Sequence, residues 1–337
     1  MRIIAAALTA ATLMSSTAMA ADQALIDAAK KEGEVTWYTT SIVDQFVRPA
    51  AQAFEKKYGV KVNFIRSNAI EIELRVTNES KAGRVQADLV DGTTTSITLK
   101  KLGLVEKWTP NVDLPDRYKD PEGYWMASQE YVLMPGYNTD LIPKGSEPKS
   151  WQDLLDPKWK GKMVWNVTPS SSAGQGFVGL VLMEMGEEKG RAYLEKLAKQ
   201  EIVGMQAAAR QVLDQVVAGE YPIALQIFHN HTTISQARGA PVYFLKTEPG
   251  MGVVLPMSLI KNALHPNAGK LLFEFILSEE GQKLMAESGE LPVLPSVPPK
   301  VAALRPGPDT FRAIYLPPEK LVENLAQWTK VYNEYFR

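Results

Sequence analysis

The stretch His265–Gly289 reads HPNAGKLLFEFILSEEGQKLMAESG and decides how the chain is interpreted. Pro266 suits the first position of a helix, because an N–H there would have no partner within the helix. Ser278 suits the cap of a second helix, and Gly289 its left-handed end. Apolar residues recur three and four positions apart, as in an amphipathic helix: Ala268, Leu271, Leu272, Phe275 and Ile276. The stretch therefore predicts two consecutive helices.

The N-terminus has the parts of a secretory signal peptide. Arg2 precedes an apolar run over Ile3–Met14, and the chain then reaches an Ala-Met-Ala cleavage pattern that ends at Ala20. The apolar run is too short to span a bilayer. We predict that residues 1–20 are a signal peptide and that the mature protein is periplasmic.

Length and composition exclude several classes of protein. A chain of 337 residues usually forms two domains. The absence of cysteine excludes disulfides, thiolate nucleophiles and cysteine metal sites. The formal net charge is −1 and there is no basic patch, which argues against a nucleic-acid partner.

Strand and helix patterns alternate along the first third of the chain. Glu34–Tyr38, Val60–Ile65 and Ala87–Val90 read as strands, and Val43–Tyr58 and Glu71–Ala82 read as the helices between them. Short connections between such elements indicate a parallel sheet wrapped by helices, so the predicted fold class is α/β.

The second half repeats this pattern. Met163–Asn166 and Ile223–Ile227 read as strands, a long apolar helix begins near Phe177, and Arg210–Ala218 reads as a helix. The last segment, Pro318–Phe336, is an amphipathic helix.

Polar residues gather where the predicted strands end. Ligands of open α/β sheets bind beyond the carboxyl ends of the strands, where helix N-termini offer free N–H groups. A second interpretation is that each hydroxyl only caps its own helix. The candidate ligand-binding residues at these ends are Tyr38, Thr39, Thr40, Ser41, Arg66, Asn68, Thr93, Thr94, Thr95, Ser170, Ser171 and Ser172.

Four phrases together resemble one family: ADLV at 87–90, WKGKMVW at 159–165, AGEYPIAL at 218–225 and the opening HPNA…SEEGQ, which LPVLPSVPP follows. The chain resembles the extracellular solute-binding proteins of ABC importers, in the branch that contains the periplasmic ferric-binding proteins. The resemblance covers essentially the whole mature chain. It implies a type II periplasmic-binding-protein fold, with two α/β lobes joined by crossing strands near Glu130–Asn138 and Met251–Pro256. It places residues 21–131 and 252–300 in lobe 1, and residues 132–251 and 301–337 in lobe 2.

The resemblance also makes ferric iron a candidate ligand, which the residues after Ile223–Ile227 test. Ferric-binding relatives place two adjacent tyrosines just after the strand that corresponds to Ile223–Ile227, whereas this sequence has Phe228-His229-Asn230-His231. We expect Tyr38 to line the cleft rather than to bind a metal. His229 and His231 share one side only if the segment is extended, and the third histidine is distant in sequence. We therefore predict no metal site and no cofactor, and treat His229 and His231 as candidate ligand contacts.

Two arginines are candidates for binding an anion. A guanidinium forms paired hydrogen bonds with carboxylates and phosphates. Arg66 stands at a strand end, and Arg210 begins a helix, where it faces either the cleft or solvent.

No catalytic motif accompanies these residues. The sequence has no G-x-S-x-G elbow, no P-loop and no dinucleotide fingerprint. We expect a monomeric, non-enzymatic binding protein that captures a small anionic organic solute, a carboxylate or a phosphate or phosphonate ester, and delivers it to an ABC permease. The alternative is a ferric-binding protein that holds iron with a bridging anion.

Overall fold

The computed structural model describes residues 22–336, so the predicted signal peptide lies outside the described residues. The strands are β1 (Glu34–Thr39), β2 (Lys61–Arg66), β3 (Leu89–Asp91), β4 (Met126–Asn138), β5 (Met163–Asn166), β6 (Val203–Met205), β7 (Ile223–Phe228), β8 (Val242–Phe244), β9 (Gly250–Leu259), β10 (Leu291–Pro292) and β11 (Ala313–Tyr315). The helices are α1 (Gln23–Glu32), α2 (Arg48–Tyr58), α3 (Ala69–Lys81), α4 (Thr95–Lys101), α5 (Gly174–Ala198), α6 (Ala209–Val217), α7 (His229–Gln236), α8 (Pro266–Leu277), α9 (Glu279–Glu287) and α10 (Pro318–Phe336). No helix among residues 22–336 is long and apolar enough to cross a membrane.

The strands form one sheet that runs through both halves of the molecule. Its main order is β2-β1-β3-β9-β4-β7-β5-β6. β1 pairs in parallel with β2 and β3, and β5 pairs in parallel with β6 and β7. The two parallel groups are separated by β9 and β4, which are antiparallel to each other.

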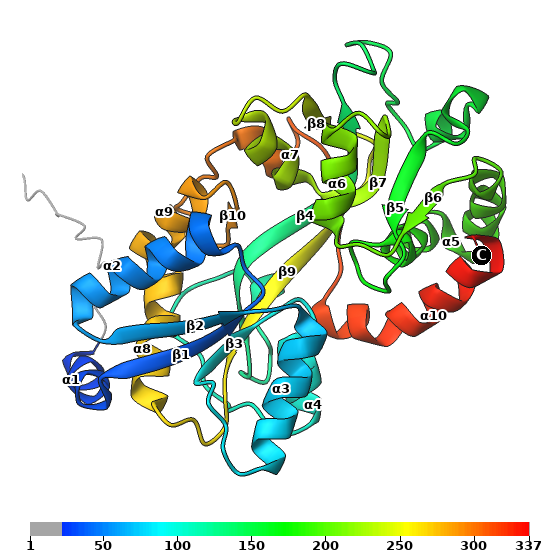
Figure 1. Ribbon diagram of the computed structural model, residues 1–337. Helices are drawn as coiled ribbons and strands as arrows, with labels where there is room; N and C mark the ends of the chain where they lie inside the picture. Colours follow the sequence, from blue (N-terminus) through cyan, green and yellow to red (C-terminus); the bar gives the residue numbers. More distant parts are fainter. Residues whose placement is uncertain (1–21, 337) are drawn as a thin grey trace, which may run out of the picture.

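β4 and β9 connect the two lobes, as the sequence predicts. They run side by side through the middle of the molecule, and their pairing extends from Met126 opposite Met257 to Leu133 opposite Met251 (Figure 1). Every residue of both strands is buried. The predicted two-lobed type II periplasmic-binding-protein fold is confirmed. The residue boundaries predicted for the two lobes stay a prediction.

Lobe 1 contains β1–β3 with helices on both faces of the sheet. Trp37 lies in the core on the face covered by α1, α2 and α8, together with the aromatic rings of Phe54 and Phe273. Tyr38 lies in a separate core beneath α3 and α4. The stripe predicted for α8 is buried along its whole length, and Ser278 Oγ accepts a hydrogen bond from Gly281 N at 3.3 Å at the start of α9.

Lobe 2 contains β5–β7, with α5 and α10 on one face and α6 on the other (Figure 1). Trp328 of α10 lies against Gly179 of α5 so closely that a Cβ on Gly179 would be 2.3 Å from the indole. Helix α5 leaves helical geometry at Gly186, where φ is +76°, and then resumes. The packing of α10 on α5 places the C-terminal segment against the strands of lobe 2.

Candidate ligand-binding site

Asp91 organises the strand ends of lobe 1. This carboxylate at the end of β3 is fully buried. It accepts hydrogen bonds from Trp37 Nε1 at 2.8 Å, from the backbone N of Thr40 at 2.8 Å and from Thr40 Oγ1 at 2.9 Å. Burial raises the pKa of Asp91, and these hydrogen bonds oppose that rise. The polar cluster predicted after β1 is therefore fixed in place by a residue of β3.

Two hydroxyls beside Asp91 have no partner among the described residues. Ser41 Oγ and Thr95 Oγ1 are both buried without a hydrogen bond. Gly92 lets Thr95 approach, because a Cβ at position 92 would lie 2.2 Å from Thr95 Oγ1 and 3.4 Å from the methyl of Thr40. Buried polar groups are rarely left unpaired, so this cluster is suited to contact another molecule.

Tyr131 of β4 lies where the two lobes meet. Its ring centroid is 4.7 Å from that of Phe228, at the end of β7. Gln129 Nε2 donates a hydrogen bond to its hydroxyl. Burial raises the pKa of Tyr131 well above its ordinary value, the nearby carboxyls of Glu290 and Asp91 add to the rise, and Arg66 opposes it. Tyr131 is therefore protonated, and its hydroxyl can donate a hydrogen bond.

The lobe 2 side of this junction begins with Phe228 and His231. Their ring centroids are 5.3 Å apart, and Nδ1 of His231 is buried without a partner. Burial lowers the pKa of His231 to about 3, and the charge of Arg210 contributes to that decrease. Arg210 is exposed and its guanidinium lies 2.8 Å from Asp214. His231 is therefore neutral and can act as a hydrogen-bonding group.

The serine loop before α5 adds a second element of lobe 2. Gln226 Nε2, on β7, donates to Ser171 O at 3.1 Å, and Ser170 Oγ lies 3.4 Å from Ser172 Oγ. The loop folds tightly over the start of α5, since a Cβ on Gly176 would be 1.8 Å from Ser171 O. The amide oxygen of Gln226, Oε1, is buried and has no hydrogen-bond partner among residues 22–336.

Glu290 and Asn230 form a buried polar pair beside the crossing strands. Asn230 Nδ2 donates to Glu290 Oε2 at 2.9 Å, and both residues are 1% exposed. Burial raises the pKa of Glu290 to about 8, and the Asn230 hydrogen bond opposes this rise. Glu290 Oε1 and Asn230 Oδ1 have no partner in the part of the chain that the structure describes.

Two of the predicted contacts point elsewhere. Tyr38 is fully buried and its hydroxyl donates to Glu79 Oε1 at 2.8 Å beneath α3, so it does not line the junction as expected. His229 lies within 2.6 Å of Leu304 O through Nε2, and its ring packs on Phe244. The segment is helical rather than extended, and residues two apart on a helix do not share a face, so His229 and His231 diverge.

Other predicted residues serve local structure. Asn68 Oδ1 accepts from Glu71 N at 3.0 Å and caps α3, and Thr39 Oγ1 accepts from Ser41 N at 3.0 Å. Thr94 Oγ1 donates a hydrogen bond to Glu73 Oε1 at 3.0 Å. The neighbouring Thr93 is partly buried. The capping interpretation therefore describes Asn68, whereas Thr39 stabilises the turn after β1 without capping a helix.

Several polar residues at this junction were not identified from the sequence as candidates. Local sequence offers no signal for them, because burial and pairing with distant segments bring them there. They are Asp91, Gln129, Tyr131, Gln226, Asn230 and Glu290.

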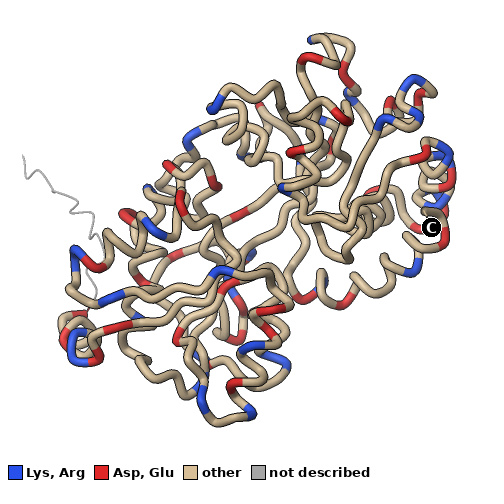
Figure 2. The backbone as a smooth tube through the Cα atoms, viewed as in Figure 1, with Lys and Arg blue, Asp and Glu red and all other residues tan. Residues whose placement is uncertain are grey.

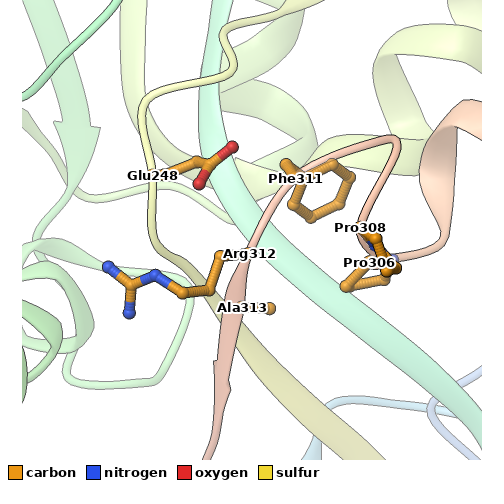
Figure 3. Close-up of a pocket in the computed structure, with 7 residues that line it drawn as sticks. Glu248, Pro306, Pro308, Phe311, Arg312 and Ala313 are labelled. Carbon is orange, nitrogen blue, oxygen red and sulfur yellow. The ribbon is translucent and has the colours of Figure 1, made fainter.

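Other features of the molecule involve other residues, among them a cavity of about 690 Å³ beside Tyr137 and one of about 420 Å³ beside Trp125. Acidic and basic residues are interspersed over both lobes (Figure 2). In residues 22–336 no three His, Asp or Glu side chains gather closely enough to hold a metal ion. A cavity of about 410 Å³ lies between Glu248 and the loop at 306–313, where the guanidinium of Arg312 points away from Phe311 and the prolines (Figure 3). Glu184 pairs with Arg312, so the cavity's guanidinium already has a partner.

Two α/β lobes on two crossing strands, with polar side chains converging where they meet, define a solute-binding protein of the periplasmic-binding-protein class. Residues 89–314 match the family model described as bacterial extracellular solute-binding protein, and the chain belongs to this family. It is the substrate-binding component of an ABC importer, which implies a permease partner, and it is not an enzyme.

Individual relatives differ in what their names say they bind. A putative 2-aminoethylphosphonate-binding periplasmic protein of Salmonella typhimurium is 25% identical and spans 80% of this chain and 77% of its own. Iron-bound HitA from Pseudomonas aeruginosa has a TM-score of 0.73 at 23% identity, over 88% of this chain and 99% of its own. AfuA from Actinobacillus pleuropneumoniae, with fructose-6-phosphate bound, has a TM-score of 0.71 at 23% identity, over 90% and 98%. These two structures show the fold.

Proposed function

We propose that this protein captures a small organic anion between its lobes, a carboxylate or a phosphate or phosphonate ester, and delivers it to the permease. The observation that carries the proposal is Arg66. It lies at the carboxyl end of β2, is exposed, and forms no salt bridge with any described residue. It pairs with Thr39 in the β1–β2 register, next to Thr40 and the Asp91 network. An unpaired guanidinium at this position suits a carboxylate or a phosphoryl group.

Groups from both lobes would complete the anion site. Ser41 and Thr95 supply hydroxyls from lobe 1, and the serine loop at 170–172 supplies further hydroxyls from lobe 2. The Thr40 hydroxyl already donates to Asp91, and Arg210 would add a second guanidinium only by leaving its ion pair with Asp214. A ligand that contacts both lobes stabilises the closed arrangement, because those contacts exist together only there. The closed form is then the one that docks on the permease.

Names of relatives support this ligand class without selecting a compound. Among the similar proteins are a phosphonate binder by name and a structure with a sugar phosphate bound. We further propose that the mature chain is periplasmic, which relatives named periplasmic support, and that it is a monomer with no nucleic-acid partner.

Ferric iron is the second candidate, favoured by the likeness to iron-bound HitA. Against it, residues 228–231 lack the tyrosine pair, and His229 is occupied by Leu304 O. An iron complex here would need an exogenous anion to supply most of the ligands.

The test is thermal melting of the mature protein against carboxylates, phosphate esters, phosphonates, sugars, amines and ferric citrate. Ligand at one hundred times its dissociation constant stabilises by about 2.7 kcal/mol, which for this size shifts the Tm by a few degrees. Stabilisation by anions alone supports the proposal. Stabilisation only by ferric iron, with a coloured complex, overturns it.

Arg66→Ala then tests the site itself. We expect this variant to bind the anion more weakly by more than about 1.5 kcal/mol, because a charge-assisted hydrogen bond is lost. Arg84→Ala is the matched control, since Arg84 is also an exposed arginine of lobe 1 but lies at the far end of α3. Equal affinity of the Arg66 variant and the wild type removes Arg66 from the site.

A further inference from the structure

Three acceptor oxygens beside the crossing strands are buried without a hydrogen bond. They are Glu290 Oε1, Asn230 Oδ1 and Gln129 Oε1, on side chains that are 1%, 1% and 0% exposed. An unpaired buried acceptor costs about 1 to 3 kcal/mol, so three of them near the lobe junction are suited to a ligand that donates hydrogen bonds. We call these three atoms the acceptor cluster.

The contacts of the acceptor cluster place its members together. Asn230 Nδ2 is bonded to the other oxygen of Glu290, and this leaves Oδ1 as the free atom of Asn230. β10 pairs with β4 so that Leu291 is opposite Glu130 and Pro292 is opposite Gln129. Glu290, one residue earlier, therefore lies beside Tyr131, whose hydroxyl accepts from Gln129. The electrostatic effect of Glu290 on Tyr131 agrees with this placement.

All three atoms of the acceptor cluster are oxygens. The two amide oxygens accept hydrogen bonds and cannot donate, and the Glu290 carboxyl becomes the third acceptor when a bound ammonium favours its ionised form. An anion would be repelled here. A primary ammonium carries one positive charge and three N–H donors, which matches three acceptors that include one carboxylate.

We propose that the transported anion also carries a protonated primary amine, which is held by Glu290, Asn230 and Gln129 while Arg66 holds the anionic group. This inference rests on the proposed function, because it assumes that the anion binds at Arg66. Glu290 lies opposite Tyr131 where the β10–β4 register is extended by one residue, so the amine end of the ligand lies beside Tyr131. The ligand class is then a small zwitterion such as an amino-phosphonate, an amino-phosphate or an amino acid.

The experiment compares probes that differ only in the amine. Calorimetry measures the affinity of the mature protein for 2-aminoethylphosphonate, 2-hydroxyethylphosphonate and ethylphosphonate, and for 3-aminopropanoate and propanoate. We expect the amine-bearing member of at least one set to bind about tenfold or more tightly than its amine-free partner, as for a charge-assisted hydrogen bond. Equal affinity within every set, or preference for the hydroxyl compound, overturns the inference while leaving the anion site intact.

Glu290→Gln tests the residue assignment. This variant keeps the shape and the Asn230 contact but removes the charge, so we expect the amine preference to fall about tenfold or more, with little change for ethylphosphonate. Glu287→Gln is the matched control, an exposed glutamate at the end of α9. An unchanged amine preference in the Glu290 variant overturns the assignment. Loss of binding for every anion in Arg66→Ala, by contrast, reports on the anion site alone.

Proton release offers a second readout. The pKa of about 8 keeps most of Glu290 protonated at neutral pH, and a bound ammonium favours its ionised form. Binding of the amine-bearing probe in buffers of different ionisation enthalpy should therefore release a proton in the wild type and none in Glu290→Gln. Should that variant fail to fold, Gln129→Met removes one acceptor at similar volume and must reduce the amine preference; no reduction overturns the inference.

Discussion

Two regions of the lobe junction offer a ligand different chemistry. Beside Asp91, at the strand ends of lobe 1, the described buried groups without partners are hydroxyls, Ser41 Oγ and Thr95 Oγ1, which can donate or accept. Beside the crossing strands they are the oxygens of Gln129, Asn230 and Glu290. The first region can therefore adapt to an anion, whereas the second favours a group that brings its own hydrogens.

The two lobes also differ in how their polar groups are held. On lobe 1, Asp91 ties Trp37 and Thr40 into one network that exists before any ligand arrives. On lobe 2, the serine loop is positioned by backbone contacts, namely Ser171 O with Gln226 and with the start of α5. A preformed surface on one lobe and a packed loop on the other predict different consequences of mutation.

The largest expected effect comes from Asp91→Ala. Removing the carboxylate leaves the indole N–H and the Thr40 donors buried and unpaired, so we expect the free energy of unfolding to fall by about 3 to 5 kcal/mol. Urea unfolding measures this. Asp214→Ala, which removes only an exposed i,i+4 partner of Arg210, should change it by less than about 0.5 kcal/mol. Similar stabilities of the two variants would show that the Asp91 network does not organise lobe 1.

The next effect is the pH dependence of Glu290. Its pKa of about 8 in the folded protein exceeds the ordinary value of 4.5, so the folded state binds more protons across this window and stability falls as pH rises through it. Glutamine cannot titrate. Between about pH 5 and about pH 9, Glu290→Gln should therefore lose less stability than the wild type, by about 2 kcal/mol or more.

The two proteins differ only at residue 290, so the difference between the two pH profiles reports on Glu290. Parallel profiles would mean that Glu290 is as accessible to water as an ordinary surface carboxyl, and that the contrast between the two regions of the junction is smaller than the structure shows.

The smallest effect is expected from Gly176→Ala on lobe 2. A methyl group 1.8 Å from Ser171 O forces the serine loop to move, which should cost about 1 to 3 kcal/mol and weaken binding of the anion. Gly307→Ala is the control, because the nearest atom to its new Cβ is Thr310 Oγ1 at 3.7 Å. Urea unfolding and calorimetry give both readouts. Full affinity in Gly176→Ala would show that the serine loop takes no part in binding.

Most elements of the fold could be predicted because their signals are local. Asp22 caps α1 and Gly33 ends it, and β5 and α10 have the bounds that the apolar patterns predict. Helix α7 was missed, since His229–Gln236 has no apolar stripe and no side-chain cap. The strand ends stay a prediction as the location of the site, and several of their side chains serve the fold.

The difference between Trp37 and Tyr38 shows why side-chain roles could not be predicted. β1 is buried on both faces, so alternation along the strand gives no clue to which residue meets the ligand. The packing of α3 decides it, by giving the Tyr38 hydroxyl a partner in Glu79, whereas Trp37 reaches Asp91 on the other face.

The sequence by itself determined the α/β class, the order of the elements, the two crossing strands and the family, because periodicity, caps and characteristic phrases are properties of neighbouring residues. Only the tertiary structure decided which polar groups converge. Glu290 stands in SGELPVLP, a stretch that reads as a loop, and becomes a buried carboxyl because β10 pairs with β4 and α7 brings Asn230 against it. Burial and partnership of this kind depend on segments about 60 to 160 residues apart, and no local pattern records them.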